Sequence, residues 1–191
     1  MAFQITRGRE KLPALLAKEL EAVAAGDGEF EVGGAVEGRT YRNHPVTLYR
    51  LDRIINAVRP RLPNHFFVAV SDDGIAAIKQ LHYETSGLIL KAQLWLGDQR
   101  HVDFVVKPSG RGIGGMLSAE AINHVVTRNK ADGIPVAIFL PNVENPQWAQ
   151  FHRRIGMTSG PDGLHVPAEG LAEFASREGP TGYKHYLLRR A

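Results

Sequence analysis

The glycine-rich segment at residues 110–115 is the part of the chain whose composition best suits chemistry. It reads Gly-Arg-Gly-Ile-Gly-Gly and precedes a stretch with helical periodicity. A turn of this kind presents backbone N–H groups at the positive end of a helix dipole, where phosphate oxygens bind. Four glycines in six residues cost backbone entropy that an ordinary turn does not require. The segment therefore predicts an anion-binding turn.

Two general nucleotide-binding motifs fit this segment incompletely. Gly110 and Gly115 have the spacing of a P-loop. That motif continues with lysine and then serine or threonine, where this chain has Met116 and Leu117. Gly110, Gly112 and Gly115 also match G-x-G-x-x-G, but a dinucleotide-binding fold would begin near the motif and continue with further βαβ units. Nucleotide hydrolysis is not expected, and dinucleotide binding is kept as an alternative.

A second segment, residues 145–157, has the pattern of a capped amphipathic helix. Asn145 is a favourable N-cap, Pro146 suits the first helical position, and Gly156 suits the end of the helix. The apolar positions recur at helical spacing: Trp148, Phe151 and Ile155. His152 lies at the edge of this apolar stripe. Its imidazole can donate a proton, although an ordinary pKa of ~6.5 leaves it mostly neutral at pH 7.

The two segments together resemble the GNAT superfamily of N-acetyltransferases. Residues 102–117 are similar to the family's pyrophosphate-binding motif, R/Q-x-x-G-x-G/A, with Ser109 at the R/Q position. Residues 145–157 are similar to the family's next motif, and the spacing from Asn145 to the closing glycine is the same. His152 stands where the family usually has a tyrosine that is proposed to protonate the leaving thiolate.

The resemblance implies a mixed α/β (α+β) fold with a mainly antiparallel central sheet flanked by helices. One domain would span residues 1–191, with a CoA-binding core at about 100–157. One parallel βαβ unit, with strands near 101–106 and 134–140, would form the gap that holds CoA. The implied reaction is transfer of acetyl from acetyl-CoA, or another acyl-CoA, to a primary amine by direct attack in a ternary complex. The acceptor would be a small molecule or a peptide, and no metal is required.

The resemblance also assigns roles to individual residues. Backbone groups before the turn would bind pantetheine, and the turn would hold the pyrophosphate. Arg111 would lie beside a phosphate, because its planar guanidinium suits bidentate contact. The cofactor-binding set is Phe104, Val105, Val106, Arg111, Gly112, Ile113, Gly114, Gly115, Met116 and Asn145. His152 would be the catalytic acid.

The sequence does not single out the base that would accept the proton of the attacking amine. Its candidates near the predicted cleft are Glu84, His101, Asp103 and Glu144. A solvated surface charge is the more ordinary role for each of them, and a water relay could replace them all. Because the family's tyrosine is replaced and no base stands out, a catalytically inactive CoA-binding or regulatory module of the same fold is the alternative.

Apolar spacing predicts the elements that position these residues. Helices are predicted at residues 12–23, 48–58, 116–130, 146–155 and 167–177. Strands are predicted at residues 65–70, 75–83, 88–96, 101–106, 134–140 and 183–188, and the first two form a hairpin. Residues 29–38 are predicted to be a short strand or an irregular loop.

The composition limits the classes of protein to which the chain can belong. The chain has 191 residues, of which 43% are hydrophobic and 23% charged, as is typical of one globular domain. It has no cysteine, which excludes disulfide scaffolds and cysteine nucleophiles. The net charge of +3 suits an anionic ligand but does not indicate a nucleic-acid-binding surface. The 8 histidines show no metal-ligand spacing.

The sequence also predicts the compartment and the partners. No apolar run approaches the ~20 residues that span a bilayer, and the N-terminus lacks the apolar core of a signal peptide. We therefore expect a cytoplasmic protein without membrane contact. The GNAT resemblance also allows a homodimer, for which the sequence itself carries no pattern.

Overall fold

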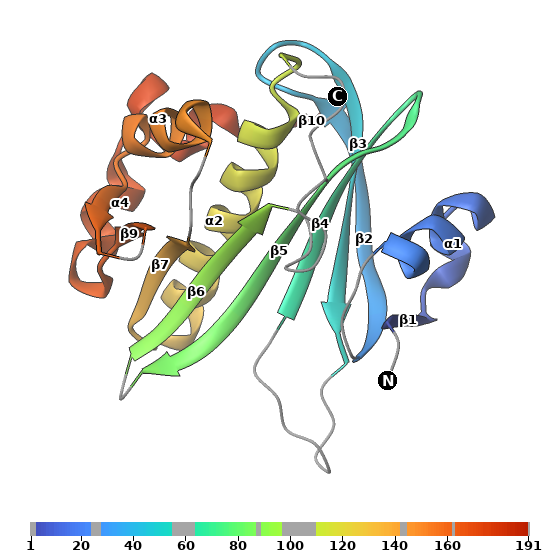
Figure 1. Ribbon diagram of the computed structural model, residues 1–191, viewed down its shortest axis with the longest axis horizontal. Coiled ribbons are helices and arrows are strands. Elements are labelled where there is room, and N and C mark those ends of the chain that lie inside the picture. Colours follow the sequence, from blue (N-terminus) through green and yellow to red (C-terminus); the bar gives the residue numbers. More distant parts are fainter. Residues whose placement is uncertain are drawn as a thin grey trace.

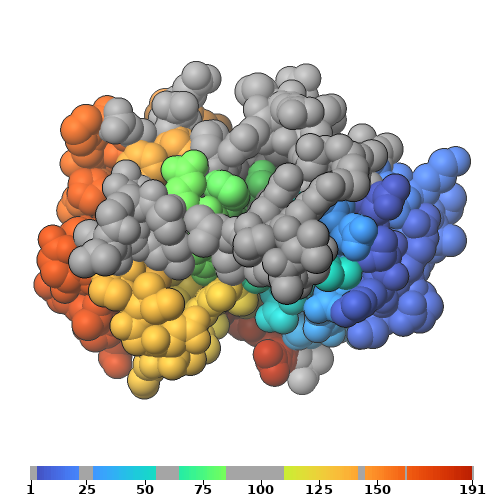
Figure 2. All heavy atoms as spheres, turned by 90° about the horizontal axis from the view of Figure 1, so that it is seen from below, coloured from blue at the N-terminus to red at the C-terminus, as the bar shows by residue number. Residues whose placement is uncertain are grey.

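One twisted sheet with helices on both faces makes up the fold (Figure 1). The computed structural model describes residues 3–23, 28–54, 64–86, 89–96, 110–141, 145–161 and 163–190. The helices α1 (Ala14–Val23) and α3 (Pro146–Arg154) lie at opposite ends of the molecule, as the space-filling view shows (Figure 2).

Ten strands form the sheet in the described part of the chain. They are β1 (Phe3–Arg7), β2 (Gly28–Arg39), β3 (Pro45–Arg53), β4 (Asn64–Ser71), β5 (Gly74–Ser86), β6 (Ile89–Leu96), β7 (Val136–Pro141), β8 (Thr158–Gly160), β9 (Gly163–Val166) and β10 (Arg189–Arg190). Their order is β1-β2-β3-β4-β5-β6-β7-β9-β8, and β10 pairs with β2. The pairs β1–β2 and β6–β7 are parallel, and the other pairs are antiparallel. This confirms the predicted fold class, a mixed and mainly antiparallel sheet flanked by helices.

The helices begin and end close to the predicted positions. The remaining α-helices are α2 (Ile113–Asp132) and α4 (Leu171–Ser176), and 3-10 turns cover Arg9–Lys11, Ala168–Gly170, Gly179–Thr181 and Tyr183–Tyr186. Gly133 ends α2, and Gly156, the predicted stop, follows α3; both have the positive φ that is common at the ends of helices. Among the described helices, none is both long enough and apolar enough to cross a bilayer.

Alternating side chains of the central strands build a core on each face of the sheet. On β4, Phe66 belongs to the cluster that α1 covers, whereas its neighbour Phe67 belongs to the cluster that α2 covers. The cluster that α2 covers includes several fully buried residues of that helix, among them Leu117, Ala121, Ile122 and Val125. Burial on both faces explains why the central strands read as near-continuous apolar runs.

The unit β6–α2–β7 is the parallel crossover of the sheet. The two strands pair over four residue pairs, of which the last is Gln93 opposite Phe139. Both strands continue beyond that pair without pairing to each other, β6 to Leu96 and β7 to Pro141. The parallel strands therefore diverge at their carboxyl ends (Figure 1). The chain runs from these ends into α2 and α3.

The prediction that residues 101–106 are the parallel partner of β7 is wrong. The strand β7 has β6 on one side and β9 on the other, so both of its edges are occupied. The partner is instead the strand predicted at 88–96. Residues 101–106 lie outside the described residues, and so do three members of the predicted cofactor-binding set: Phe104, Val105 and Val106.

Two other predicted elements differ from the structure. The helix predicted at 48–58 is wrong, because residues 45–53 form β3 and pair with β2 and β4. The last strand predicted at 183–188 is a 3-10 turn, in which Tyr183 and Tyr186 are both buried at a spacing of three residues. The uncertain segment at 29–38 is part of the long strand β2.

Candidate functional site

The glycine turn begins α2, as predicted. Gly110 (φ 85) and Gly112 (φ 78) both have left-handed backbone conformations, which glycine adopts without strain. Gly112 is the N-cap of α2, and a helical hydrogen bond runs from the Met116 N–H to the Gly112 carbonyl at 3.0 Å. The N–H groups of the three residues between these two have no acceptor within the helix. The turn therefore presents donors at the positive end of α2.

The β2–β3 turn, residues 40–44, braces the glycine turn from one side. The Thr40 hydroxyl donates a hydrogen bond to the Arg111 carbonyl at 2.7 Å. The Arg42 guanidinium donates to the Gly110 carbonyl, also at 2.7 Å. In a trans peptide the N–H points opposite to the C=O. The N–H groups of Arg111 and Gly112 therefore point away from the β2–β3 turn, in the direction from which an anion could approach.

Aromatic rings pack closely against the glycines of the turn. A Cβ atom on Gly112 would lie 2.7 Å from the Tyr41 ring, and a Cβ on Gly115 would lie 3.2 Å from Phe151. Tyr186 contacts both rings edge-on, at centroid distances of 4.8 Å from Tyr41 and 5.0 Å from Phe151. These contacts join the β2–β3 turn, α2, α3 and the last 3-10 turn. A side chain at position 112 would disturb this packing as well as any ligand.

Arg111 is placed where an anion could reach its side chain. The side chain is 41% exposed. Its Nη1 lies 3.4 Å from Nε2 of His44 and 4.0 Å from a carboxylate oxygen of the exposed Asp73. Exposed contacts of this length contribute little free energy. The guanidinium is therefore available for a stronger partner.

Asn145 caps α3, as predicted. Its Oδ1 accepts hydrogen bonds from the N–H groups of Gln147 at 2.9 Å and Trp148 at 3.4 Å. The cap fixes the first turn of α3, from which Trp148 and, one turn later, His152 project. The helix therefore places an indole and an imidazole together, with ring centroids 5.5 Å apart and the planes stacked.

His152 does not have the properties expected of a catalytic acid. The residue is 0% exposed, and its Nδ1 lies 2.8 Å from the Trp148 carbonyl, to which it donates a hydrogen bond. Burial, together with the positive charge of Lys79, lowers the pKa of His152 to about 3. The imidazole is therefore neutral at pH 7, and its single N–H is already engaged. The other nitrogen, Nε2, is buried without a hydrogen-bond partner among the described residues.

Lys79 is a buried charge that belongs to none of the motifs in the sequence. The residue lies on β5, is 0% exposed, and its ammonium has no hydrogen-bond partner in the described part of the chain. Its Nζ lies 5.1 Å from the centroid of the Trp148 ring. Burial lowers the pKa of Lys79 from 10.5 to about 7. The available clue was a lysine on the inward side of an alternating strand, between Ala77 and Leu81.

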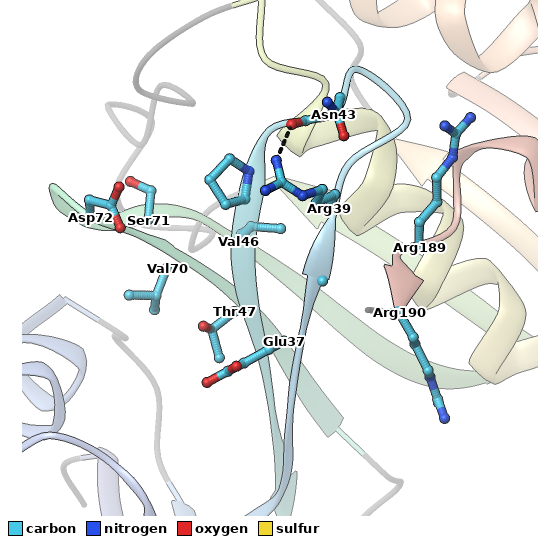
Figure 3. A pocket seen from close by; sticks show the side chains of 12 residues that line it. Glu37, Arg39, Asn43, Val46, Thr47, Val70, Ser71, Asp72, Arg189 and Arg190 are labelled. Carbon is cyan, nitrogen blue, oxygen red and sulfur yellow. Dashed lines mark hydrogen bonds between the residues drawn. The ribbon is translucent and has the colours of Figure 1, made fainter.

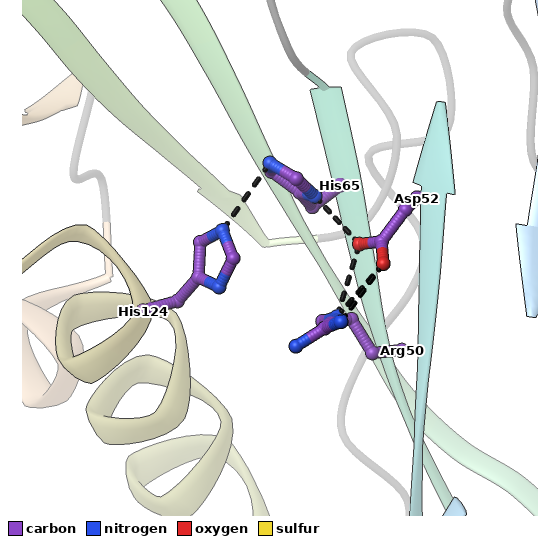
Figure 4. A network of polar contacts seen from close by, with 4 residues as sticks. All are labelled: Arg50, Asp52, His65 and His124. Atoms are coloured by element: carbon purple, nitrogen blue, oxygen red, sulfur yellow. Dashed lines mark hydrogen bonds and ion pairs between the residues drawn. The ribbon is translucent and has the colours of Figure 1, made fainter. Parts of the chain in front are cut away.

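A second polar network joins the middle of α2 to the sheet (Figure 4). His65 on β4 lies between Asp52 on β3 and His124 on α2. Its Nδ1 is 2.7 Å from the Asp52 carboxylate, and its Nε2 is 3.3 Å from Nε2 of His124. Arg50 also binds the Asp52 carboxylate, at 2.9 Å. Burial raises the pKa of Asp52, but the hydrogen bonds from His65 and Arg50 outweigh it and lower the pKa overall.

This network predicts a loss of stability in mild acid. Burial, followed by the neighbouring His65 and Arg50, lowers the pKa of His124 from 6.5 to about 4. Unfolding therefore takes up a proton between these two values, and the free energy of unfolding falls as the pH decreases from 6.5 to 4. The contribution of Asp52 is lost at lower pH, as the pH falls through 3.8, the value at which the unfolded carboxyl is half protonated.

Urea unfolding of the wild type and His124→Gln at pH 7, 6, 5 and 4 measures this effect. The wild type should lose about 1–3 kcal/mol more than the variant across this range. The matched control is His185→Gln, which removes an exposed histidine and should follow the wild type. Parallel pH profiles for the wild type and His124→Gln would show that His124 is not held neutral by the fold.

A surface hollow of about 400 Å³ lies next to the β2–β3 turn (Figure 3). Its charged side chains have both signs: Glu37, Arg39, Asp72, Arg189 and Arg190. The Arg39 guanidinium turns to the carbonyl of Asn43, to which it donates at 2.9 Å. Arg189 and Arg190 point in opposite directions. The charges do not converge on one point, so we assign this hollow no ligand.

The other predicted site residues are exposed, have buried side chains or lie outside the described residues. Of the candidate bases, Glu84 is exposed and lies 4.0 Å from His82, whereas His101, Asp103 and Glu144 lie outside the described residues. Ile113 and Met116 are fully buried, so only their backbone could meet a ligand. Within the described ranges, no group of three histidine, aspartate or glutamate residues could hold a metal ion.

Comparisons with known structures find partial structural similarity at low sequence identity. No family model matches the chain, and no curated protein matches it. A candidate acetyltransferase from Exiguobacterium sp. 255-15 is 16% identical, with a TM-score of 0.41 over 60% of this chain and 68% of its own. A tyrosine-to-phenylalanine mutant of the AtaT toxin, solved with the C-terminus of its antitoxin AtaR and acetyl-CoA, is 20% identical, with a TM-score of 0.40 over 61% and 74%. The strand order and the β6–α2–β7 crossover, rather than these matches, define the fold class of this chain.

Proposed function

We propose that the chain is an acyl-CoA-dependent N-acyltransferase, which transfers acetyl to a primary amine by direct attack in a ternary complex. The observation that carries the proposal is the braced, left-handed glycine turn at the start of α2, next to parallel strands that diverge. Unpaired N–H groups at a helix N-terminus favour a pyrophosphate. Beyond the last pair, the facing edges of β6 and β7 do not bind each other. Their backbone groups can hydrogen-bond to an extended, amide-containing arm such as pantetheine.

Each part of the turn has a role in this proposal. The N–H groups of residues 111–115 bind the pyrophosphate, and the half-exposed guanidinium of Arg111 binds a phosphate oxygen. Asn145 caps α3 and so fixes the position of the Trp148 and His152 rings. The amine attacks the thioester carbonyl directly, and an acyl-cysteine intermediate is excluded because the chain has no cysteine. Positioning of the two substrates supplies most of the rate.

Thiol release from acetyl-CoA tests this function. The chain contributes no thiol of its own, so every thiol detected with a disulfide reagent comes from CoA. We expect saturable release that depends on one class in a panel of amines comprising diamines, amino acids, lysine peptides and peptides with a free N-terminus. Without any protein-dependent release across the panel, the transferase proposal is overturned.

The second candidate is a CoA-binding module without turnover. The observation that favours it is the neutral, engaged state of His152, which leaves the family-like position without a proton to donate. Binding of acetyl-CoA without amine-dependent thiol release supports this candidate over the enzyme. Binding of NADP in place of acetyl-CoA supports the dinucleotide alternative.

A further inference from the structure

Two polar side-chain atoms are buried together beneath α3 without hydrogen-bond partners in the described ranges. They are Nζ of Lys79 and Nε2 of His152. Both side chains lie against Trp148, the ammonium 5.1 Å from the indole centroid and the imidazole stacked at 5.5 Å. A buried, unpaired cation is among the most unfavourable groups a core can hold. Departures of this kind from good packing are typical of functional sites.

The register of the sheet places Lys79 near the point where the parallel strands diverge. On β5, Gln80 is opposite Trp95 of β6, so Lys79 is level with Leu96 at the carboxyl end of β6. This level lies beyond Gln93, where the pairing of β6 with β7 ends. Lys79 is therefore one strand away from the divergence. It lies on the face of the sheet that α3 covers, because its Nζ meets Trp148.

Among the described residues, no group compensates the positive charge of Lys79. The adjacent imidazole of His152 is neutral, with a pKa of about 3, and offers only a lone pair at Nε2. The ion pairs that join described residues include none to Lys79. Cation–π contact with the indole offsets part of the desolvation cost. Within the described part of the chain, Lys79 therefore lacks an anionic partner.

Acyl transfer from CoA develops negative charge on the carbonyl oxygen of the thioester and on the departing sulfur, and only the sulfur keeps that charge once the carbon–sulfur bond has broken. We propose that Lys79 is the catalytic acid of the transfer and protonates the departing sulfur of CoA. The inference rests on the proposed function and names the residue that completes it. As the amine nitrogen bonds to the thioester carbon, the carbon–sulfur bond breaks and its electron pair goes to sulfur. A proton then passes from Nζ of Lys79 to the sulfur, and the excess proton on the new amide nitrogen returns to the neutral lysine.

The burial of Lys79 suits this role. Burial lowers its pKa to about 7, so the ammonium can release a proton at neutral pH, which an exposed lysine does only weakly. His152 is then a positioning residue, whose Nε2 lone pair can accept a hydrogen bond from the ammonium when the sulfur approaches. The Trp148 ring fixes both groups.

Titration of the CoA thiol in the complex tests the proposal without knowledge of the acceptor. The chain has no cysteine, so the thiolate absorbance of the complex, blanked with desulfo-CoA, comes from CoA alone. We expect the apparent pKa of the bound thiol to be about 1–3 pH units lower in the wild type than in Lys79→Met. Lys79→Gln should resemble Lys79→Met, because it keeps a polar group but lacks the charge. Lys18→Met, at an exposed position on α1, should match the wild type.

The outcomes separate failure of this inference from failure of the proposed function. If calorimetry detects no binding of CoA to the wild type, both the proposed function and the proposed role of Lys79 are overturned. If CoA binds the wild type and Lys79→Met equally and the thiol titrates identically, the function stands and Lys79 is not the acid. If Lys79→Met loses CoA binding while near-UV circular dichroism shows the native fold, Lys79 binds the ground state and the acid role is overturned.

Discussion

Lys79→Met raises the free energy of unfolding at pH 7 by about 1–4 kcal/mol. The substitution keeps the length of an unbranched side chain and removes a cation that is 0% exposed and has no hydrogen-bond partner among the described residues. Most core substitutions destabilise a protein, so the direction of this change is diagnostic. Urea unfolding followed by tryptophan fluorescence measures it. If Lys79→Met is more stable than the wild type but releases less thiol, Lys79 favours function at the expense of stability, as is common at functional sites.

The effect of Lys79→Met depends on pH in a defined direction. Lys79 has a pKa of about 7 in the folded chain and 10.5 in the unfolded chain, so folding releases a proton between these values. The free energy of unfolding of the wild type therefore rises with pH from 7 to 10.5. The difference in free energy of unfolding between Lys79→Met and the wild type is constant below pH 7 and disappears by pH 10.5. Lys18→Met, at an exposed site, should leave stability unchanged. A destabilised Lys79→Met at pH 7 contradicts the account of an unpaired buried charge.

Gly110→Asp weakens the binding of acetyl-CoA by about 10–100-fold relative to Gly110→Asn. Position 110 is the place for this test, because a Cβ there would meet no atom within 4 Å. At Gly112 the same change would collide with the Tyr41 ring. Asparagine and aspartate both tolerate a left-handed backbone and have nearly equal size. The two variants therefore differ in the charge placed beside the pyrophosphate, and calorimetry compares their dissociation constants.

The salt dependence of this pair provides an internal control. Repulsion between an exposed carboxylate and a phosphate is screened, so the difference between Gly110→Asp and Gly110→Asn should shrink as the salt concentration rises. The unfolding free energies of the two variants should agree, since both carry the same backbone strain. Equal affinities of Gly110→Asp and Gly110→Asn at low salt would show that the phosphates bind elsewhere.

Local backbone chemistry made the ends of the helices predictable. The caps of α2 and α3 depend on residue types with strong positional preferences, namely glycine in a left-handed conformation and asparagine before proline. The hairpin β4–β5 was predictable for the same reason, because Asp72-Asp73-Gly74 marks a turn between two apolar runs. These elements contain the glycine turn and the aromatic face of α3, and so most of the candidate site.

Long-range pairing was not predictable in the same way. Leu48 and Leu51 are buried on opposite faces of β3, and their spacing mimics the repeat of a helix. Reading β3 as a helix concealed the β2–β3 turn, and with it the contacts of Thr40 and Arg42 with the glycine turn. Those contacts join residues about 70 positions apart, with separations of 71 and 68. No local pattern encodes them.

The charge state of the buried groups could not be predicted from residue type alone. The ordinary pKa of histidine suggested that His152 could act as an acid near neutral pH. Complete burial and the engaged Nδ1 make it neutral, whereas burial brings Lys79 into the range where a lysine can exchange protons. The protonation of both residues thus depends on their environments, and these depend on the packing of α3 against β5.

The most direct test of the acyl-CoA site is an amide NMR titration of the wild-type chain with acetyl-CoA. The account predicts saturable shifts of the Gly112, Ile113, Gly114 and Gly115 amides, because these N–H groups would become donors to phosphate oxygens. NADP at the same concentration should leave these four amides in place or shift them without saturation. Saturation of the complex with acetyl-CoA while all four amides stay unmoved would contradict the account.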